Sequence, residues 1–326
     1  MSYRLLLKML FPFFLISNTF GEVIPLEIAH KSNEMDGLLF QDSQLERVAT
    51  GFQFVEGPVW MGSQREGYLL FSDIPANRVY QWAPHSGEVS IKIDLVHDPK
   101  IVTGASGGSN GLLEDGEGRL VLFEHGMRRV SRIDHDGVRR SLTDRFEGRK
   151  LNSPNDGVFH SNGSLFFTDP PYGLQKGDLD RNKAQEVNGI YRLDMDGNVA
   201  LLASMKRPNG IGLSLDERTL YVANSDSEKR VWMQFEVKDD FSLGRPEVLF
   251  DATTLPEPGV PDGFAVDLKG YIWASGPGGV VVLSPDGSHI GTILTPELPA
   301  NTTFDREFKN LFITARTSLY RLRLRK

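Results

Sequence analysis

Six residues with side-chain oxygens recur at the start of six similar segments of the chain. They are Glu56, Asn110, Asn155, Asn209, Asp262 and Asn301, with separations of 54, 45, 54, 53 and 39 residues. Carboxylate and amide oxygens are hard ligands, so a fold that brought these residues together could bind a hard divalent cation. Asn and Asp close to Gly are also common turn formers. A turn explains any one of these positions alone, whereas the recurrence favours convergence of the whole set.

The segments that follow these residues share one plan of a short strand, a polar turn, a strongly apolar strand and an alternating third strand. The expected second strands are LLFSD (69–73), LVLFE (120–124), LFFTD (165–169), LYVAN (220–224), IWASG (272–276) and LFITA (311–315). Short apolar runs between turn signals are typical of buried strands. The sequence therefore predicts an all-β protein.

The length of the repeat fits one four-stranded blade of a β-propeller, and six blades fill residues 45–326. A single blade cannot bury both of its faces, so the six must stack into one domain. The segment LERVAT from Leu45 is expected to supply the outer strand of the last blade and to close the ring, after an N-terminal extension at 22–44. Because the innermost strands line the channel, the six oxygen-bearing residues should meet there and form a central metal site.

The first 21 residues have the layout of a secretory signal peptide. Arg4 and Lys8 precede or flank the apolar run MLFPFFLI (9–16), and the small residues of SNTFG follow. The run is short for a bilayer span, and Pro12 disfavours a permanent anchor helix. We expect a periplasmic or secreted protein with no membrane attachment after cleavage. An uncleaved anchor is the alternative, because Thr19 to Gly21 is a weak cleavage site.

The composition excludes several classes of protein. A chain of 326 residues with 40% hydrophobic and 24% charged residues can build a sizeable core. The formal net charge of -7 gives no basic surface for nucleic acid, so no nucleic-acid partner is expected. The absence of cysteine excludes disulfides, thiolate metal sites and cysteine nucleophiles. The oligomeric state is left open.

Five motifs resemble the SMP-30/gluconolactonase/LRE family of six-bladed lactonases in their order and spacing. They are EGPVW (56–60), SPNDG (153–157), TDPPYG (168–173), RPNGIGLS (207–214) and PDGFAVD (261–267). The stretch SNGLLEDGEGRLVLFEHGMRRVSRI (109–133) is similar to the bacterial gluconolactonase branch. The resemblance covers roughly residues 45–325.

This resemblance implies a ligand set for one divalent cation, usually Ca2+. The implied ligands are Glu56, Asn155, Asn209 and Asp262, and Asp262 is also the family's candidate general base. Two carboxylates and two amide oxygens suit Ca2+ or Mg2+, with Zn2+ a further possibility. Some animal members have a sugar-contacting arginine where this chain has Ser153, so that contact cannot be transferred.

The resemblance implies metal-dependent hydrolysis of a sugar lactone, similar to gluconolactone, to the hydroxy acid. The cation would polarise the ester carbonyl and water would be the nucleophile. Further candidate substrate contacts are Asn110, Glu124, His125 and Tyr172. A salt-bridged structural role is the alternative for Glu124 and His125, and aromatic packing is the alternative for Tyr172.

Other functions remain open on the same fold. A propeller hydrolase acting on aryl esters or organophosphates would keep the metal and change the pocket, and a ligand-binding propeller would lack turnover. A serine hydrolase is disfavoured because GASGGSNG (104–111) has no G-x-S-x-G elbow. DHDG (134–137) and DMDG (194–197) are similar to calcium loops but lack the Glu of an EF-hand, so hairpin turns are predicted there.

The predicted signal peptide can be tested on the exported protein. We expect the mature chain to begin near Glu22 and to accumulate in the periplasm or the medium, because residues 1–21 have the basic, apolar and small-residue order of a signal peptide. N-terminal sequencing of the fractionated protein checks this. A soluble cytoplasmic chain beginning at Met1 would contradict it.

Overall fold

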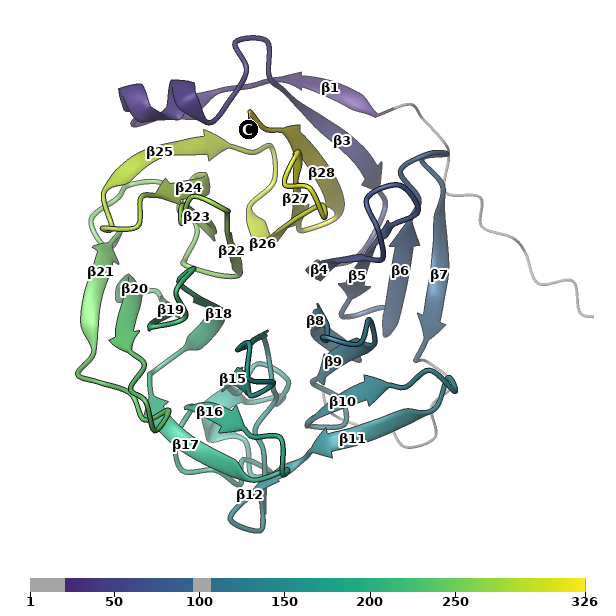
Figure 1. The fold of residues 1–326 in the computed structure, drawn as a ribbon, viewed down its shortest axis with the longest axis vertical. Coiled ribbons are helices and arrows are strands. Elements are labelled where there is room, and N and C mark those ends of the chain that lie inside the picture. The colour runs from purple at the N-terminus through teal and green to yellow at the C-terminus, as the bar shows by residue number, and fades with distance from the viewer. Residues whose placement is uncertain (1–20, 96–106, 326) are drawn as a thin grey trace, which may run out of the picture.

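A computed structural model of the protein describes residues 21–95 and 107–325. Six antiparallel sheets follow one another around a central axis, which confirms the predicted six-bladed β-propeller (Figure 1). Most of the predicted signal peptide lies outside the described residues. Within the described part of the chain, no helix is long and apolar enough to cross a membrane.

The first three blades each contain four strands, which follow one another from the axis outwards. Blade one contains β4 (Val55–Met61), β5 (Tyr68–Asp73), β6 (Arg78–Trp82) and β7 (Val89–Asp94). Blade two contains β8 (Ser109–Glu114), β9 (Leu120–Glu124), β10 (Arg129–Ile133) and β11 (Arg139–Thr143). Blade three contains β14 (Gly157–Phe159), β15 (Leu165–Asp169), β16 (Gly189–Leu193) and β17 (Val199–Ser204).

The last three blades repeat this order, and two of them gain a fifth strand from the N-terminal region. Blade four contains β18 (Pro208–Leu213), β19 (Thr219–Asp226), β20 (Lys229–Glu236) and β21 (Glu247–Asp251). Blade five contains β22 (Phe264–Val266), β23 (Ile272–Gly276), β24 (Gly279–Leu283), β25 (His289–Leu294) and β2 (Ile28–Ala29). Blade six contains β26 (Pro299–Phe304), β27 (Asn310–Ala315), β28 (Ser318–Arg323), β3 (Gln44–Thr50) and β1 (Glu22–Pro25).

Short elements complete the described structure. The strands β12 (Arg145–Phe146) and β13 (Arg149–Lys150) form a two-stranded ribbon before blade three. The 3-10 helices are η1 (Asn33–Gly37) and η2 (Gly177–Leu179). The second strands β9, β15 and β23 have the bounds predicted from the sequence, and the other three differ by one or two residues at an end.

The ring is closed by pairing between the two ends of the chain. β3 pairs antiparallel with β28, with Leu45 opposite Leu322 and Thr50 opposite Ser318, which confirms the role expected for the segment from Leu45. The residues predicted as an N-terminal extension add to two blades, because β1 pairs with β3 and β2 pairs with β25. Met35 of η1 is fully buried in the core of blades five and six. The segment before β3 therefore extends blades five and six, next to the pairing of β3 with β28 that closes the ring.

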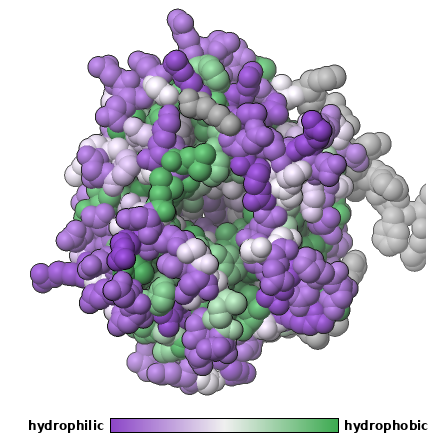
Figure 2. Space-filling model, in the orientation of Figure 1, coloured by the Kyte–Doolittle hydropathy of each residue, from purple (hydrophilic) through white to green (hydrophobic). Residues whose placement is uncertain are grey.

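Neighbouring blades bury their faces against each other. Phe166 and Ile190 of blade three pack with Ile211 and Val222 of blade four in one fully apolar cluster. Apolar area removed from water in this way is the main stabilising contribution to folding, and it requires the whole ring. Figure 2 shows one face of the ring, where hydrophilic residues dominate the periphery and hydrophobic residues gather around the central hollow.

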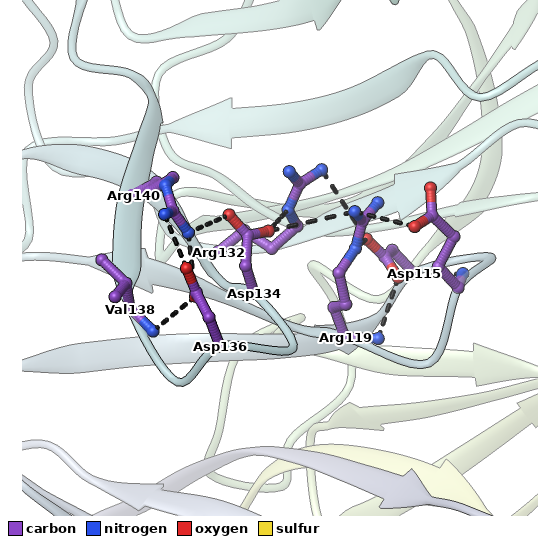
Figure 3. A network of polar contacts seen from close by, with 8 residues as sticks. Asp115, Arg119, Arg132, Asp134, Asp136, Val138 and Arg140 are labelled. Carbon is purple, nitrogen blue, oxygen red and sulfur yellow. Dashed lines mark hydrogen bonds and ion pairs between the residues drawn. The ribbon is translucent and has the colours of Figure 1, made fainter.

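The predicted hairpin turn at DHDG lies between β10 and β11. The amide of Gly137 donates to the carbonyl oxygen of Asp134, as a tight turn requires. Figure 3 shows arginines around the turn: Arg140 donates to Asp134 and Asp136 at 2.7 Å each, and Arg132 Nε donates to Asp134 at 2.6 Å. The backbone hydrogen bond confirms the turn predicted at DHDG, and its two carboxylates are paired with arginines.

Candidate active site

The six innermost strands surround a central channel of about 260 Å³. Its lining comes from all six blades and is mostly apolar beyond the strand starts, with residues such as Val59, Leu112 and Ile211. Asp156 and Asn301 also belong to the lining. Asn301 is itself one of the six aligned residues, and the other five each lie one or two positions before a lining residue of their inner strand, so the six strand starts surround one axis.

Glycine after an oxygen-bearing residue allows the strand starts to approach this closely. A Cβ atom on Gly57 would lie 2.2 Å from the carbonyl oxygen of Asn110, and one on Gly263 would lie 2.0 Å from Cγ of Asn301. Gly57 also has a positive φ of 51°. These glycines therefore do more than favour a turn. They let the inner strands of neighbouring blades approach each other, since any side chain would push the blades apart.

Three carboxylates from alternate blades, Glu56, Asp156 and Asp262, lie near enough to the axis to act on one another. Burial raises the pKa of Glu56 to about 7 and that of Asp156 to about 7. The pKa of Asp262 is raised well above its ordinary value, first by burial and then by the charges of Glu56 and Asp156. Like charges held together in a poorly solvated site repel each other, so a positive charge placed among them would be favoured.

Asp262 has an oxygen with unused hydrogen-bonding capacity. Its side chain is partly accessible overall, but Oδ1 is buried and accepts no hydrogen bond from any described residue. A buried carboxylate oxygen without a donor is costly unless another group compensates it. This atom is therefore a candidate cation ligand.

Asn209 lies beside Asp262, as the predicted ligand set requires. Its Nδ2 donates to Ser225 Oγ at 2.9 Å, and its amide also forms a hydrogen bond that lowers the pKa of Asp262. Asn155 is buried, and its carbonyl oxygen accepts the amide of Gly111 at 2.8 Å. The backbone of blade three is thereby joined to blade two at the axis.

Asp156 is a buried carboxylate near the axis that lies outside the ligand set implied by the resemblance. The backbone amide of Asn155 donates to the carbonyl oxygen of Thr168, and that of Asp262 donates to the carbonyl oxygen of Ser275. Asn155 and Asp262 are therefore equivalent in backbone pairing. Asp156, the next residue, is equivalent to Gly263 of blade five. In four other blades a glycine follows the oxygen-bearing residue, so an Asp at this position in blade three was the available signal. The turn composition of SPNDG offers a second explanation for an Asp at this position, so the sequence alone does not separate the two.

Asn301 is outside the ligand set that the resemblance implies, but its side chain contacts the carboxylates near the axis. Its Nδ2 donates to Asp156 Oδ2 at 3.3 Å, across the channel from blade six to blade three. Its Oδ1 accepts the amide of Thr302 at 2.8 Å. The Asn301 side chain also forms a hydrogen bond that lowers the pKa of Glu56. It therefore links two of the three carboxylates.

The candidate substrate contacts divide into two groups. Asn110 and His125 are buried together, with Asn110 Nδ2 and His125 Nε2 3.3 Å apart. Burial lowers the pKa of His125 to about 4, so its imidazole is neutral at pH 7 and accepts from the amide. Tyr172 hydrogen-bonds to Ser225 and Asn209 and lies near the charge of Asp262. These three residues lie with the axial set.

Glu124 is turned toward the outer strands of blade two. Arg129 Nε donates to Glu124 Oε1 at 2.8 Å, Ser131 Oγ donates to the same oxygen, and Arg139 lies 3.8 Å from Oε2. The Glu124 side chain is only 2% exposed. These contacts correspond to the salt-bridged structural alternative considered from the sequence.

The donor set can be compared with the needs of a cation. Among the described residues, no group of three or more His, Cys, Asp or Glu side chains is placed to hold a metal by itself. The implied set has only two carboxylates, and its other two members are amides. The unpaired Asp262 oxygen and the mutual repulsion of three carboxylates fit a hard divalent cation bound with amide help.

Comparison with known proteins defines the class. The family model described as "SMP-30/Gluconolactonase/LRE-like region" matches residues 54–317, and the chain belongs to this family. It is 34% identical to a gluconolactonase of Zymomonas mobilis over 310 residues, covering 91% of this chain and 86% of the relative.

Two further relatives extend the comparison. A gluconolactonase structure from Xanthomonas campestris aligns with a TM-score of 0.79 and 32% identity, covering 94% of this chain and 98% of the other. The chain is 28% identical to the pentonolactonase XacC of Haloferax volcanii over 255 residues, covering 76% of each. The family resemblance expected from the sequence motifs is thus confirmed.

Glu124→Gln tests whether this carboxylate supports the fold or the substrate. Removing the charge leaves Arg129 without its buried partner, so we expect the free energy of unfolding to fall by about 3 kcal/mol while KM stays close to that of the wild type. Thermal unfolding and lactone kinetics measure both quantities.

The matched control is Glu228→Gln, which removes an exposed, solvent-screened ion pair with Lys206 and should leave the Tm unchanged. A raised KM for Glu124→Gln with unchanged thermal stability would instead place Glu124 in the substrate site.

Proposed function

We propose that this protein hydrolyses a sugar lactone similar to gluconolactone, with a divalent cation held by Glu56, Asn155, Asn209 and Asp262. Membership of the lactonase family supports the reaction class, a carboxylic ester hydrolase as predicted from the sequence. The observation that carries the metal site is the buried, unpartnered Oδ1 of Asp262 beside two further carboxylates. Its substrate partner is a small molecule.

The cation is proposed to be Ca2+, because all four ligand atoms are oxygens and the site has no sulfur ligand; Mg2+ and Zn2+ are alternatives. When bound, it would polarise the lactone carbonyl and stabilise negative charge on the oxyanion. Glu56 and Asp262 supply two negative charges that balance a divalent ion. Asp156 adds a third charge nearby, moderated by its hydrogen bond from Asn301.

The residues of the chain have distinct roles in this proposal. Asp262 takes a proton as water adds to the carbonyl carbon, and the carbonyl π electrons move to the oxygen. Collapse of the tetrahedral intermediate breaks the bond to the ring oxygen, which receives the proton held by Asp262 and leaves as the hydroxyl of the hydroxy acid, so that Asp262 is a carboxylate again. In this proposal neutral His125, Asn110 and Tyr172 hydrogen-bond the sugar hydroxyls. Activity in the periplasm or outside the cell remains part of the proposal.

Asp262→Asn tests the base and the ligand together. The substitution keeps the shape of the side chain and removes its charge, so kcat on gluconolactone should fall by at least about 100-fold while the protein stays folded. Rates on gluconolactone, an aryl ester and a phosphotriester, with circular dichroism as the measure of folding, check the result and the substrate class.

The matched control is Asp286→Asn, at an exposed turn whose carboxylate accepts from Ser284 and Ser288. It should retain wild-type kcat. Wild-type turnover by folded Asp262→Asn would remove Asp262 from the mechanism, and a preference for the aryl ester or the phosphotriester would replace the lactone as substrate.

Removal of the cation is expected to stop the reaction without unfolding the ring. The four ligands come from four blades, so the ion adds some stability by mass action. The apolar contacts between blades do not involve the site, so the far-UV circular dichroism spectrum should be retained. Lactone hydrolysis and the spectrum are followed together during EDTA treatment and after separate addition of Ca2+, Mg2+ and Zn2+.

Undiminished hydrolysis after verified metal removal would contradict the cation-assisted reaction. Loss of the spectrum together with activity would assign the ion a primarily structural role.

A further inference from the structure

The hydroxyl of Ser225 in β19 lies between two of the proposed ligands. Its Oγ accepts from Nδ2 of Asn209 at 2.9 Å and donates to the carbonyl oxygen of Pro261 at 2.5 Å. Pro261 directly precedes Asp262 in the chain. One small side chain of blade four therefore contacts the side chain of one ligand and the backbone next to another.

The direction of these hydrogen bonds determines how the Asn209 amide is turned. A serine hydroxyl has one proton to donate, and a carbonyl oxygen can only accept. Because the Ser225 proton is given to Pro261, Ser225 can only accept from Asn209. The NH2 end of the Asn209 carboxamide must therefore face Ser225, and Oδ1 is left at the other end. A cation coordinates only that oxygen.

Asn301, at the equivalent position of blade six, is held in the opposite sense. The backbone amide of Thr302 can only donate, and it binds Oδ1 of Asn301 at 2.8 Å. The NH2 end of Asn301 consequently faces Asp156. Two asparagines related by the repeat are thus fixed in different orientations by their local partners. One can present an oxygen to a cation, and the other donates to a carboxylate.

We propose that Ser225 is a positioning residue that fixes the Asn209 carboxamide with its oxygen available to the cation. The inference rests on the proposed function, in which Asn209 is a ligand. Tyr172 belongs to the same network, since its hydroxyl forms hydrogen bonds with Ser225 and Asn209. Ser225 itself does not touch the reacting atoms; it acts through Asn209.

The test is calorimetric titration of metal-free protein with calcium chloride. Ser225→Ala removes one of the acceptors that hold the NH2 end of Asn209 and loosens its orientation, so calcium affinity should fall by about 10- to 100-fold, as is typical when a partner of a metal ligand is lost. Ser225→Thr keeps the hydroxyl and should restore most of the affinity. Ser275→Ala is the matched control, because Ser275 Oγ is buried without a hydrogen-bond partner among the described residues, and its affinity should equal that of the wild type.

A double-mutant cycle shows whether Ser225 acts through Asn209. In the Asn209→Ala background, Ser225→Ala should have no further effect on calcium affinity, since there is no amide left to orient. An equal loss in both backgrounds, or wild-type affinity in Ser225→Ala with only a lowered Tm, would overturn the positioning role. Wild-type protein that hydrolyses lactone without binding calcium or another divalent cation would overturn the metal proposal as well.

Discussion

The mutual repulsion of Glu56, Asp156 and Asp262, held close to one another near the axis, is the interaction on which the candidate site depends. Three carboxylates this close would each favour the protonated form, and burial raises the pKa of all three. The fold keeps them together because they come from three rigid blades that cannot separate without breaking the ring. The surroundings offset the repulsion only in part, through the amides of Asn301 and Asn209. A divalent cation would offset the remainder.

The ring supplies this rigidity through contacts far from the axis. Blades five and six share a core that includes Trp273, Ile313 and Tyr320, and η1 adds Met35 to it. β3 closes the last blade by pairing with β28. Because the apolar contacts are distributed around the whole circumference, the axial residues can be polar and mutually repulsive without determining whether the protein folds. Residues held on rigid elements in this way keep a more precise geometry than residues on loops.

The repeat also shows how equivalent positions acquire different chemistry. The six strand starts have similar backbone placement, and what distinguishes them is the immediate partner of each side chain. Asn110 is bonded to His125, Asn209 to Ser225, and Asn301 to Thr302 and Asp156. Because these partners differ from blade to blade, a repeated scaffold gives its equivalent amides different surroundings.

The sequence by itself determined the all-β class, the six repeats, the positions of the second strands and the closing role of the segment from Leu45. These follow from local patterns, since the alternation of apolar residues and the turn signals act within one blade. The same patterns selected Glu56, Asn110, Asn155, Asn209, Asp262 and Asn301 as residues that meet at the axis. The resemblance to the family, and not the patterns, singled out four of them as ligands.

Only the tertiary structure decided that Asp156 joins them, that Glu124 faces Arg129, and that Asn301 contacts the carboxylates. Each of these depends on which way a side chain points from its strand and on what another blade places opposite it. Contacts between residues 145 positions apart, such as Asn301 with Asp156, leave no periodic signal in the chain. They are set by the closing of the ring, which fixes the distances across the channel.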